Sequence, residues 1–231
     1  ATPAPTPDTA ERMLSQMTVE EKLCQLLVVH PEALTGAAVT AMDDALKAAL
    51  EAYPVGGVLL DTGNMKSREQ LTALTAALSD YSLLITVDEE GGRVGRLMNT
   101  VGTTRLSSMF SYREFGTETA YQNAVTIASD LKSCGFNTDF APVADVWTNA
   151  KNSVIGDRAY SSDFDEAAQL VAAAVRGFRD TGTICCLKHF PGHGSTLEDS
   201  HEGTAIVDKT IEELKASDLK PFVSGIEAGA D

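Results

Sequence analysis

The sequence predicts an α/β fold in which helices cover a parallel β-sheet. Helical and strand-like segments alternate along the 231 residues, and the strand-like segments are continuous apolar runs. Such runs are typical of strands that are buried on both faces, as in parallel sheets between layers of helices. Several of them end in a polar residue, namely Asp61, Asp88, Asp145 and Lys188. Polar residues at the carboxyl ends of strands occur in (β/α)8 barrels and in open doubly wound sheets, so the pattern leaves both architectures open.

The individual elements follow from apolar spacing and from the residues that start or stop helices. Helical spacing predicts helix within residues 9–27, with a new start at Thr18, which opens a capping box with Glu21. Strands are expected at residues 26–30, 55–60, 83–87, 137–146 and 184–187, the fourth of them interrupted by Pro142. Further helices are expected at residues 42–52, 68–78, 113–132, 164–179 and 210–228, the last with a second start at Pro221.

Composition excludes several classes of partner. The formal net charge of -15 argues against nucleic acid and anionic membranes, because both attract basic surfaces. No apolar run is long enough to span a bilayer, so no membrane-spanning segment is expected. The length fits one domain better than two. These features favour a neutral or small-molecule substrate.

The start of the chain and its cysteines bear on the compartment. Pro alternates with Ala and Thr in the first residues, which predicts a linker or disordered N-terminus at residues 1–10 and a domain at residues 11–231. A spacer behind a removed signal or lipid anchor would have this composition, which slightly favours a secreted or cell-surface location over the cytoplasm. Cys185 and Cys186 are adjacent in a predicted strand and point to opposite faces, so they suit two buried thiols better than a disulfide.

The stretch 188–201, with the sequence KHFPGHGSTLEDSH, is the strongest candidate for a functional site. It holds three of the four histidines, a lysine and an aspartate at a strand-to-loop junction. Titratable groups are costly to bury, and such clusters are the usual material of catalytic sites. Asp199 stands two residues before His201, so it could fix the tautomer of the imidazole and raise its pKa for general acid/base catalysis. In isolation the pair would rather be a turn cap and a solvated histidine, but its neighbourhood favours chemistry.

Other candidates are weaker when judged by residue type alone. Lys188 and His189 alternate at the strand end, and a structural ion pair is as plausible for them as a site. Asp88 opens the segment 88–96 (DEEGGRVGR) and could accept hydrogen bonds from ligand hydroxyls, whereas the alternative is an acidic turn with surface arginines. Arg158 is a lone loop arginine whose spacing decides nothing.

A metal site is disfavoured. His189, His193, Asp199 and His201 would supply enough ligands. However, Pro191 and the following glycine separate the first two histidines, which therefore cannot share one helical face as in the usual His-x-x-x-His site. The double glycines lack the spacing of a dinucleotide or phosphate loop. We expect no metal and no cofactor.

Three motifs together resemble a known family. The stretch 188–194, followed by Asp199-Ser200-His201, closely resembles the signature of family 3 glycoside hydrolases of the β-N-acetylglucosaminidase branch. Segments 88–96 and 152–158 also match, in the same order, and the resemblance extends from about Thr18 to the end of the chain. It implies a (β/α)8 TIM-type barrel. It also implies retaining hydrolysis of terminal β-linked N-acetylglucosamine from glycans or peptidoglycan fragments.

The resemblance assigns roles to individual residues. His201, paired with Asp199, would be the general acid/base, where most retaining enzymes use a carboxylic acid. The residues that would bind the sugar are Asp88, Arg96, Arg158, Lys188 and His189.

The sequence departs from the family at its C-terminal end. The carboxylate nucleophile of the family lies after a further strand, and Asp231 matches a Gly-Ala-Asp at the start of the sixth strand that is not the nucleophile. The chain thus resembles an incomplete barrel of about five strand–helix units plus the start of a sixth. We expect it to be catalytically inactive or nearly so. The open edges of the first and fifth strands predict self-association.

Three other functions stay open at this point. The family could act on another β-glycoside, or by phosphorolysis. A metal-dependent hydrolase would lose activity with a chelator. A non-catalytic sugar-binding fragment would keep a pocket of Asp88, Arg158, Lys188 and His189 without turnover.

Overall fold

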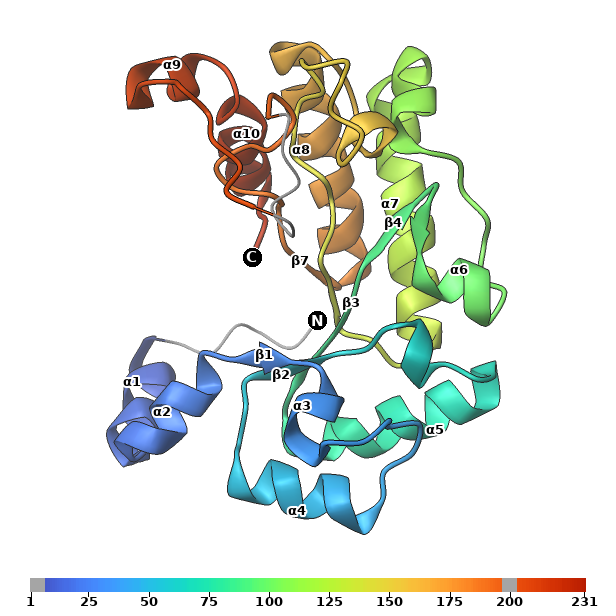
Figure 1. Cartoon of the computed structure of the whole chain (residues 1–231), viewed down its shortest axis with the longest axis vertical. Coiled ribbons are helices and arrows are strands. Elements are labelled where there is room, and N and C mark those ends of the chain that lie inside the picture. Colours follow the sequence, from blue (N-terminus) through green and yellow to red (C-terminus); the bar gives the residue numbers. More distant parts are fainter. Residues whose placement is uncertain (1–6, 197–202) are drawn as a thin grey trace. The chain divides into compact units, whose positions relative to one another are not determined.

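A computed structural model of the chain describes residues 7–196 and 203–231 (Figure 1). The residues form two compact units. The first unit extends to Val87 and includes Cys134–Asn137, and the second comprises Asp88–Ser133 and Thr138–Asp231.

The first unit alternates helices with three parallel strands. Strand β2 pairs with β1 on one side and with β3 on the other, and Gly57 is matched to Val28 and to Leu84. A Cβ at Gly57 would lie 2.6 Å from the carbonyl oxygen of Leu84, so only glycine permits this approach. The elements are α1 (Pro7–Gln16), α2 (Val19–Gln25), β1 (Val28–Val29), α3 (Pro31–Thr35), α4 (Asp44–Ala52), β2 (Gly57–Leu59), η1 (Thr62–Asn64), α5 (Arg68–Leu78), η2 (Ser79–Tyr81) and β3 (Leu84–Val87).

The helices of this unit lie close to the positions expected from the sequence. The expected burial of the apolar residues of the first two helices is not observed. Thr18 and Glu21 form the expected capping box of α2. Met13 and Leu14 of α1 and Val19 and Leu23 of α2 nevertheless remain exposed, and Leu26 after α2 is 80% exposed. Helical spacing identifies an apolar stripe, whereas burial of the stripe needs a facing element. The helix α1 also includes Pro7–Ala10, the last part of the segment expected to be a linker, whereas residues 1–6 lie outside the described part.

The second unit contains the longest helices of the described residues. Its elements are β4 (Glu89–Gly91), β5 (Val94–Gly95), α6 (Arg96–Thr100), η3 (Met109–Phe115), α7 (Gly116–Ser133), β6 (Thr138–Asp139), η4 (Gly156–Arg158), α8 (Phe164–Thr181), β7 (Ile184–Cys185), α9 (Ile211–Ala216) and α10 (Lys220–Ala228). None of the helices in residues 7–196 and 203–231 is long and apolar enough to cross a membrane.

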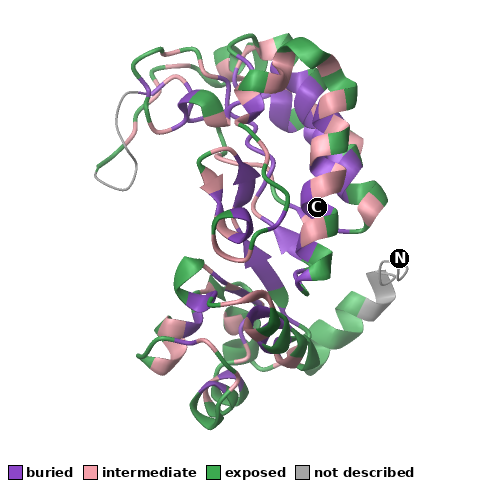
Figure 2. Cartoon of the chain, turned by 90° about the vertical axis from the view of Figure 1, so that its right-hand side faces the viewer, coloured by how far each residue is buried: buried purple, intermediate pink, exposed green. Residues whose placement is uncertain are grey.

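Helix α8 lies between α7 and α10 and packs against both (Figure 1). At Gly177 a Cβ would lie 2.6 Å from the carbonyl oxygen of Tyr121, so glycine lets α8 approach the backbone of α7. Ala124 is also buried at this contact, and Figure 2 shows most of the strand residues buried as well. Within this unit α8 also contacts β7, and α7 contacts β4.

Strands β6 and β7 bring two polar strand ends together. They pair in parallel, with Asp139 matched to Cys185, and an isolated parallel bridge joins Val143 to Lys188 further along. The strand β6 is much shorter than the strand expected at residues 137–146, because Pro142 has no N–H to donate to a ladder. The expectation of two buried thiols is wrong for Cys186, which is exposed, whereas Cys185 is buried; neither forms a disulfide.

Candidate functional site

A cavity of about 230 Å³ lies within the second unit. All five residues that the resemblance assigns to sugar binding line it: Asp88, Arg96, Arg158, Lys188 and His189. Glu90, Val94, Val154 and His193 complete its wall. Residues from three separate sequence motifs thus meet at one site, as expected for the carboxyl ends of parallel strands.

A β-hairpin that the sequence analysis missed positions the first motif. Strands β4 and β5 are antiparallel, and Gly91 and Gly92 turn the chain with φ of 88° and 59°, a region that favours glycine. The carboxylate of Glu89 accepts hydrogen bonds from the backbone N–H groups of residues 97 and 98, at the start of α6. It thereby stabilises the N-terminus of the helix whose first residue is Arg96. The hairpin returns the chain so that Asp88 and Arg96 line the same cavity.

Glu90 is the buried anion of the site. Its side chain is only 2% exposed and accepts two hydrogen bonds from Arg158, from Nε and Nη2, both at 2.8 Å. Lys188 Nζ lies 2.6 Å from Glu90 Oε1. Burial raises the pKa of Glu90, whereas the hydrogen bonds from Arg158 and the charge of Lys188 lower it. The lowering effects together are larger, so the pKa of Glu90 lies below its ordinary value. Glu90 is therefore an ionised counter-ion for two cations.

Asp88 differs from Glu90 in its exposure. Lys188 Nζ lies 2.5 Å from Asp88 Oδ1, and the side chain of Asp88 is 25% exposed. Both oxygens of Glu90 are occupied by cations, whereas Asp88 is more open to the cavity. Asp88 is thus the carboxylate that is better placed to accept hydrogen bonds from a ligand.

Asp145 orients His189. The Asp145 side chain is fully buried, and its Oδ2 accepts from His189 Nδ1 at 2.6 Å and from the His189 backbone N–H at 3.2 Å. On the other side of the ring, Nη2 of Arg158 lies 3.3 Å from His189 Nε2. A guanidinium can only donate, so His189 Nε2 accepts and Nδ1–H donates to Asp145. The sequence analysis recognised Asp145 only as a polar strand end. Its contact with His189 was not expected, because the two residues lie 44 positions apart in the chain.

His193 is part of the same network. Its backbone N–H donates to Asp145 Oδ1 at 2.6 Å, and its Nδ1 lies 2.5 Å from Thr196 Oγ1. Asn152 Nδ2 donates to the His193 carbonyl at 2.7 Å, which connects this loop to the segment that carries Arg158. The sequence analysis counted His193 among the histidines of the stretch 188–201 and considered a role of its own for it only as a metal ligand. Its neighbourhood in the structure assigns it to the wall of the cavity.

Another buried carboxyl group, that of Asp139, lies close to the hairpin. Asp139 Oδ1 accepts from the Glu89 backbone N–H at 3.0 Å, and Oδ2 has no hydrogen-bond partner among the described residues. Burial raises the pKa of Asp139 well above its ordinary value. Burial also raises the pKa of Glu89. These two carboxyl groups do not line the cavity and differ in this respect from Asp88 and Glu90.

The pair expected to act as general acid/base, Asp199 and His201, lies outside the described residues. In the described part of the chain, no group of three or more His, Cys, Asp or Glu side chains is arranged to hold a metal ion. There the imidazoles of His189 and His193 contact Asp145, Arg158 and Thr196.

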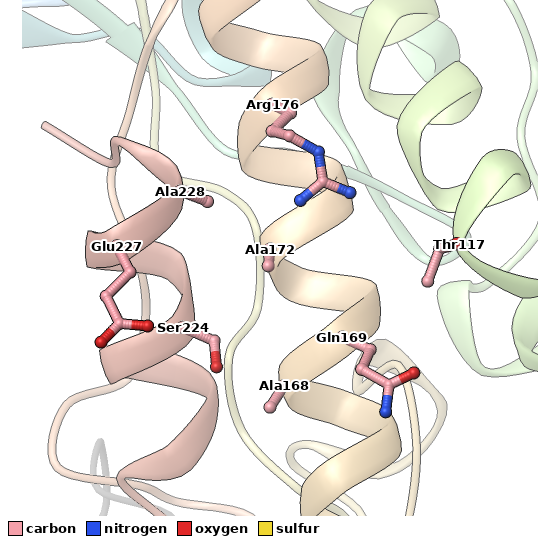
Figure 3. A pocket seen from close by; sticks show the side chains of 8 residues that line it. All are labelled: Thr117, Ala168, Gln169, Ala172, Arg176, Ser224, Glu227 and Ala228. Atoms are coloured by element: carbon pink, nitrogen blue, oxygen red, sulfur yellow. The ribbon is translucent and has the colours of Figure 1, made fainter.

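A separate hollow of about 440 Å³ lies on the helices, between α7, α8 and α10 (Figure 3). Arg176 and Glu227 are its charged lining residues, and alanines form much of the remaining wall. It contains none of the motif residues. Its size alone therefore does not make it the better candidate.

Comparison with known proteins supports the resemblance. Residues 18–231 match the glycosyl hydrolase family 3 N-terminal domain. A β-hexosaminidase of Stenotrophomonas maltophilia (strain R551-3) is 42% identical over 187 residues, which cover 77% of this chain and 55% of the relative. β-Hexosaminidase A of Pseudoalteromonas piscicida is 34% identical over 240 residues, covering 99% of this chain and 40% of the relative. The chain therefore spans about half the length of these curated relatives.

Solved structures agree. A family 3 β-N-acetylglucosaminidase from Paenibacillus sp. str. FPU-7 superposes with a TM-score of 0.84 at 34% identity, covering 93% of this chain and 41% of that one. Native NagZ from Neisseria gonorrhoeae gives a TM-score of 0.77 at 33% identity, covering 84% of this chain and 59% of that one. The likeness decides between the two architectures in favour of the TIM-type barrel, of which these residues form an incomplete part. The chain belongs to glycoside hydrolase family 3 and matches the N-terminal domain of its β-hexosaminidases.

Proposed function

We propose that this domain binds the terminal N-acetylglucosamine of β-linked glycans or peptidoglycan fragments for retaining hydrolysis. The observation that carries the proposal is the single cavity lined by Asp88, Arg96, Arg158, Lys188 and His189. The names of the related β-hexosaminidases and β-N-acetylglucosaminidases support the choice of sugar.

The charges of the site suit an uncharged ligand. Asp88 and Glu90 line the cavity with three cations, and the carboxylate of Asp145 lies directly behind His189. Negative and positive groups therefore balance, so the cavity offers hydrogen bonds rather than a net field. Asp88 would accept from sugar hydroxyls, whereas Lys188 and Arg158 would donate to sugar oxygens.

The acid/base role rests on the resemblance. His201, charged with the help of Asp199, would protonate the glycosidic oxygen as the leaving group departs and then activate water. Retention also requires a carboxylate nucleophile on the opposite face of the sugar. Glu90 is unsuited to this role because both of its oxygens are bound to cations in a buried position. We place the nucleophile where the family has it, C-terminal to Asp231, and expect residues 1–231 alone to bind the sugar without turnover.

Two measurements test this function. Calorimetry with residues 1–231 should show binding of N-acetylglucosamine, and Lys188→Ala should weaken it at least tenfold, whereas the exposed Lys215→Ala should bind as the parent chain does. An aryl β-N-acetylglucosaminide should release no chromophore with residues 1–231. Extension of the chain through the remaining barrel strands should restore release, and His201→Ala should abolish it again.

The outcomes separate the parts of the proposal. Absence of sugar binding would contradict the substrate assignment. Turnover by residues 1–231 that disappears in His201→Ala would support the acid/base but contradict our placement of the nucleophile. Turnover that survives His201→Ala would contradict the acid/base assignment.

A further inference from the structure

The turn of the β4–β5 hairpin carries an arginine to which the resemblance gives no role. Arg93 lies directly before β5, and its side chain is 47% exposed. By exposure alone it would be one of the surface arginines that the sequence analysis considered for segment 88–96. Its hydrogen bonds nevertheless reach residues 60 to 62 positions further along the chain. Arg93 therefore joins two of the three sequence motifs.

Arg93 holds three successive carbonyl groups of the loop 153–155. Its Nη2 donates to the carbonyl oxygens of Ser153, Val154 and Ile155 at 2.8, 2.7 and 3.0 Å, so at least one of its two hydrogens is shared. Nε of the same guanidinium lies 3.4 Å from Asp157 Oδ1. Carbonyl oxygens that converge on one point repel one another, so the loop needs donors and positive charge there. A guanidinium supplies both.

Two of these carbonyl groups also bind Arg158. The Val154 carbonyl oxygen accepts from Arg158 Nη1 at 2.9 Å, and the Ile155 carbonyl oxygen accepts from the Arg158 backbone N–H at 3.0 Å. A carbonyl oxygen has two lone pairs, so Arg93 and Arg158 can use it at the same time. Arg93 thus fixes two of the acceptors that set the position of Arg158.

The side chain of Arg158 extends from this anchored loop to the sugar cavity. Its Nε and Nη2 bind Glu90, and Nη2 also lies 3.3 Å from His189 Nε2. Glu90 belongs to the same hairpin as Arg93. The hairpin therefore holds Arg158 at two points, through Arg93 at the loop backbone and through Glu90 at the guanidinium. Val154, whose carbonyl Arg93 binds, lines the cavity as well.

We propose that Arg93 is a positioning residue of the sugar site, which holds the loop 153–155 so that Arg158 presents its guanidinium to the sugar. This inference rests on the proposed function, because it assumes that Arg158 donates to a sugar oxygen. Arg93 does not line the cavity and acts through Arg158. Small displacements of a binding group cost affinity, so loss of Arg93 should weaken sugar binding in a domain that stays folded.

The test measures binding of N-acetylglucosamine to residues 1–231 by calorimetry. Arg93→Ala should weaken it about tenfold, the factor that corresponds to one hydrogen bond from a charged group. Arg179→Ala is the matched control and should bind as the parent chain does. Arg179 is 52% exposed and its Nη1 donates to the Ala228 carbonyl at 3.0 Å, but neither residue lines the cavity. Asp157→Asn removes only the ion pair of Arg93 and should also bind as the parent chain does.

Addition of guanidinium chloride separates positioning from a general loss of structure. Arg93 is half exposed, so its place in Arg93→Ala is open to solvent. A free guanidinium ion can donate to the same carbonyl groups, and millimolar guanidinium chloride should therefore restore sugar binding to Arg93→Ala. The same concentration of sodium chloride should restore nothing. A domain that was merely destabilised would lose binding with this denaturant rather than regain it.

Each outcome is decisive. Full binding by Arg93→Ala would overturn the positioning role and leave the proposed function intact. An equal loss of binding in Arg179→Ala or Asp157→Asn would also overturn it. The same holds for weakened binding that guanidinium does not restore, and for loss of the far-UV circular dichroism of Arg93→Ala. Absence of sugar binding by the parent chain would refute the proposed function itself, and this inference with it.

Discussion

Replacement of Glu90 by glutamine tests the electrostatic account of the site. Glu90 is 2% exposed and neutralises Arg158 and Lys188, which are each 13% exposed. Removal of one partner from a buried ion pair typically costs 3–5 kcal/mol, because the remaining charge stays buried without compensation. Glutamine keeps the size and one acceptor oxygen, and Lys188 keeps Asp88. We therefore expect Glu90→Gln to lower the free energy of unfolding by about 3 kcal/mol, the lower end of this range.

Urea unfolding followed by far-UV circular dichroism at pH 7 measures this change. The matched control is Asp157→Asn, which removes an ion pair with Arg93 at 3.4 Å whose side chains are about half exposed. Exposed pairs contribute at most about 1 kcal/mol, so the control should change the free energy of unfolding by about 0.5 kcal/mol or less. If Glu90→Gln were no more destabilising than Asp157→Asn, the buried cluster would not be held together by charge and our reasoning would be wrong.

The same variant has a predicted pH dependence. The pKa of Glu90 is lowered in the folded protein, so its stabilising contribution is complete above the unfolded pKa of about 4.3 and is lost as the pH falls through the folded value. The difference in unfolding free energy between the parent chain and Glu90→Gln should therefore be largest near neutral pH and shrink below about pH 4. A difference that grows on acidification would contradict the assignment of Glu90 as the ionised partner.

Two further predictions concern buried positions near the site. The pKa of Asp139 is raised in the folded protein, so the folded state binds this proton more tightly than the unfolded state does. The unfolding free energy of the parent chain should therefore fall relative to that of Asp139→Asn as the pH rises above about 3.9, the unfolded pKa. Urea titrations between pH 4 and 8 that give a constant difference would contradict this. At Gly194 a Cβ would lie 2.0 Å from the carbonyl oxygen of Val146, so Gly194→Ala should lower the free energy of unfolding by about 1–3 kcal/mol. Gly203→Ala should not, because no atom of the described residues lies within 4 Å of a Cβ there. Equal melting temperatures of the two variants would count against the packing argument.

Local signals determined most of the secondary structure. Capping residues and apolar spacing place α2, α4, α5 and α8 close to their expected bounds, because these signals act within a few residues. The hairpin of β4 and β5 was missed because its strands are only two or three residues long and carry charged residues and glycines. Exposure of the apolar stripe on α1 and α2 was also not predictable, since burial depends on a facing element.

The family, the barrel fold that it implies and five of the nine residues that line the cavity of Asp88 and Lys188 were expected from the sequence, because three motifs of the chain resemble those of a known family. The tertiary structure decided which groups act together. Glu90 lies 68 positions from Arg158, and Asp145 lies 44 positions from His189, yet these side chains are in direct contact. Asp88 is open to the cavity, whereas Glu90 is buried between two cations. The run of acidic residues in the sequence does not predict this difference. Burial and long-range pairing set the charge and orientation of each group, and both exist only once distant segments have packed.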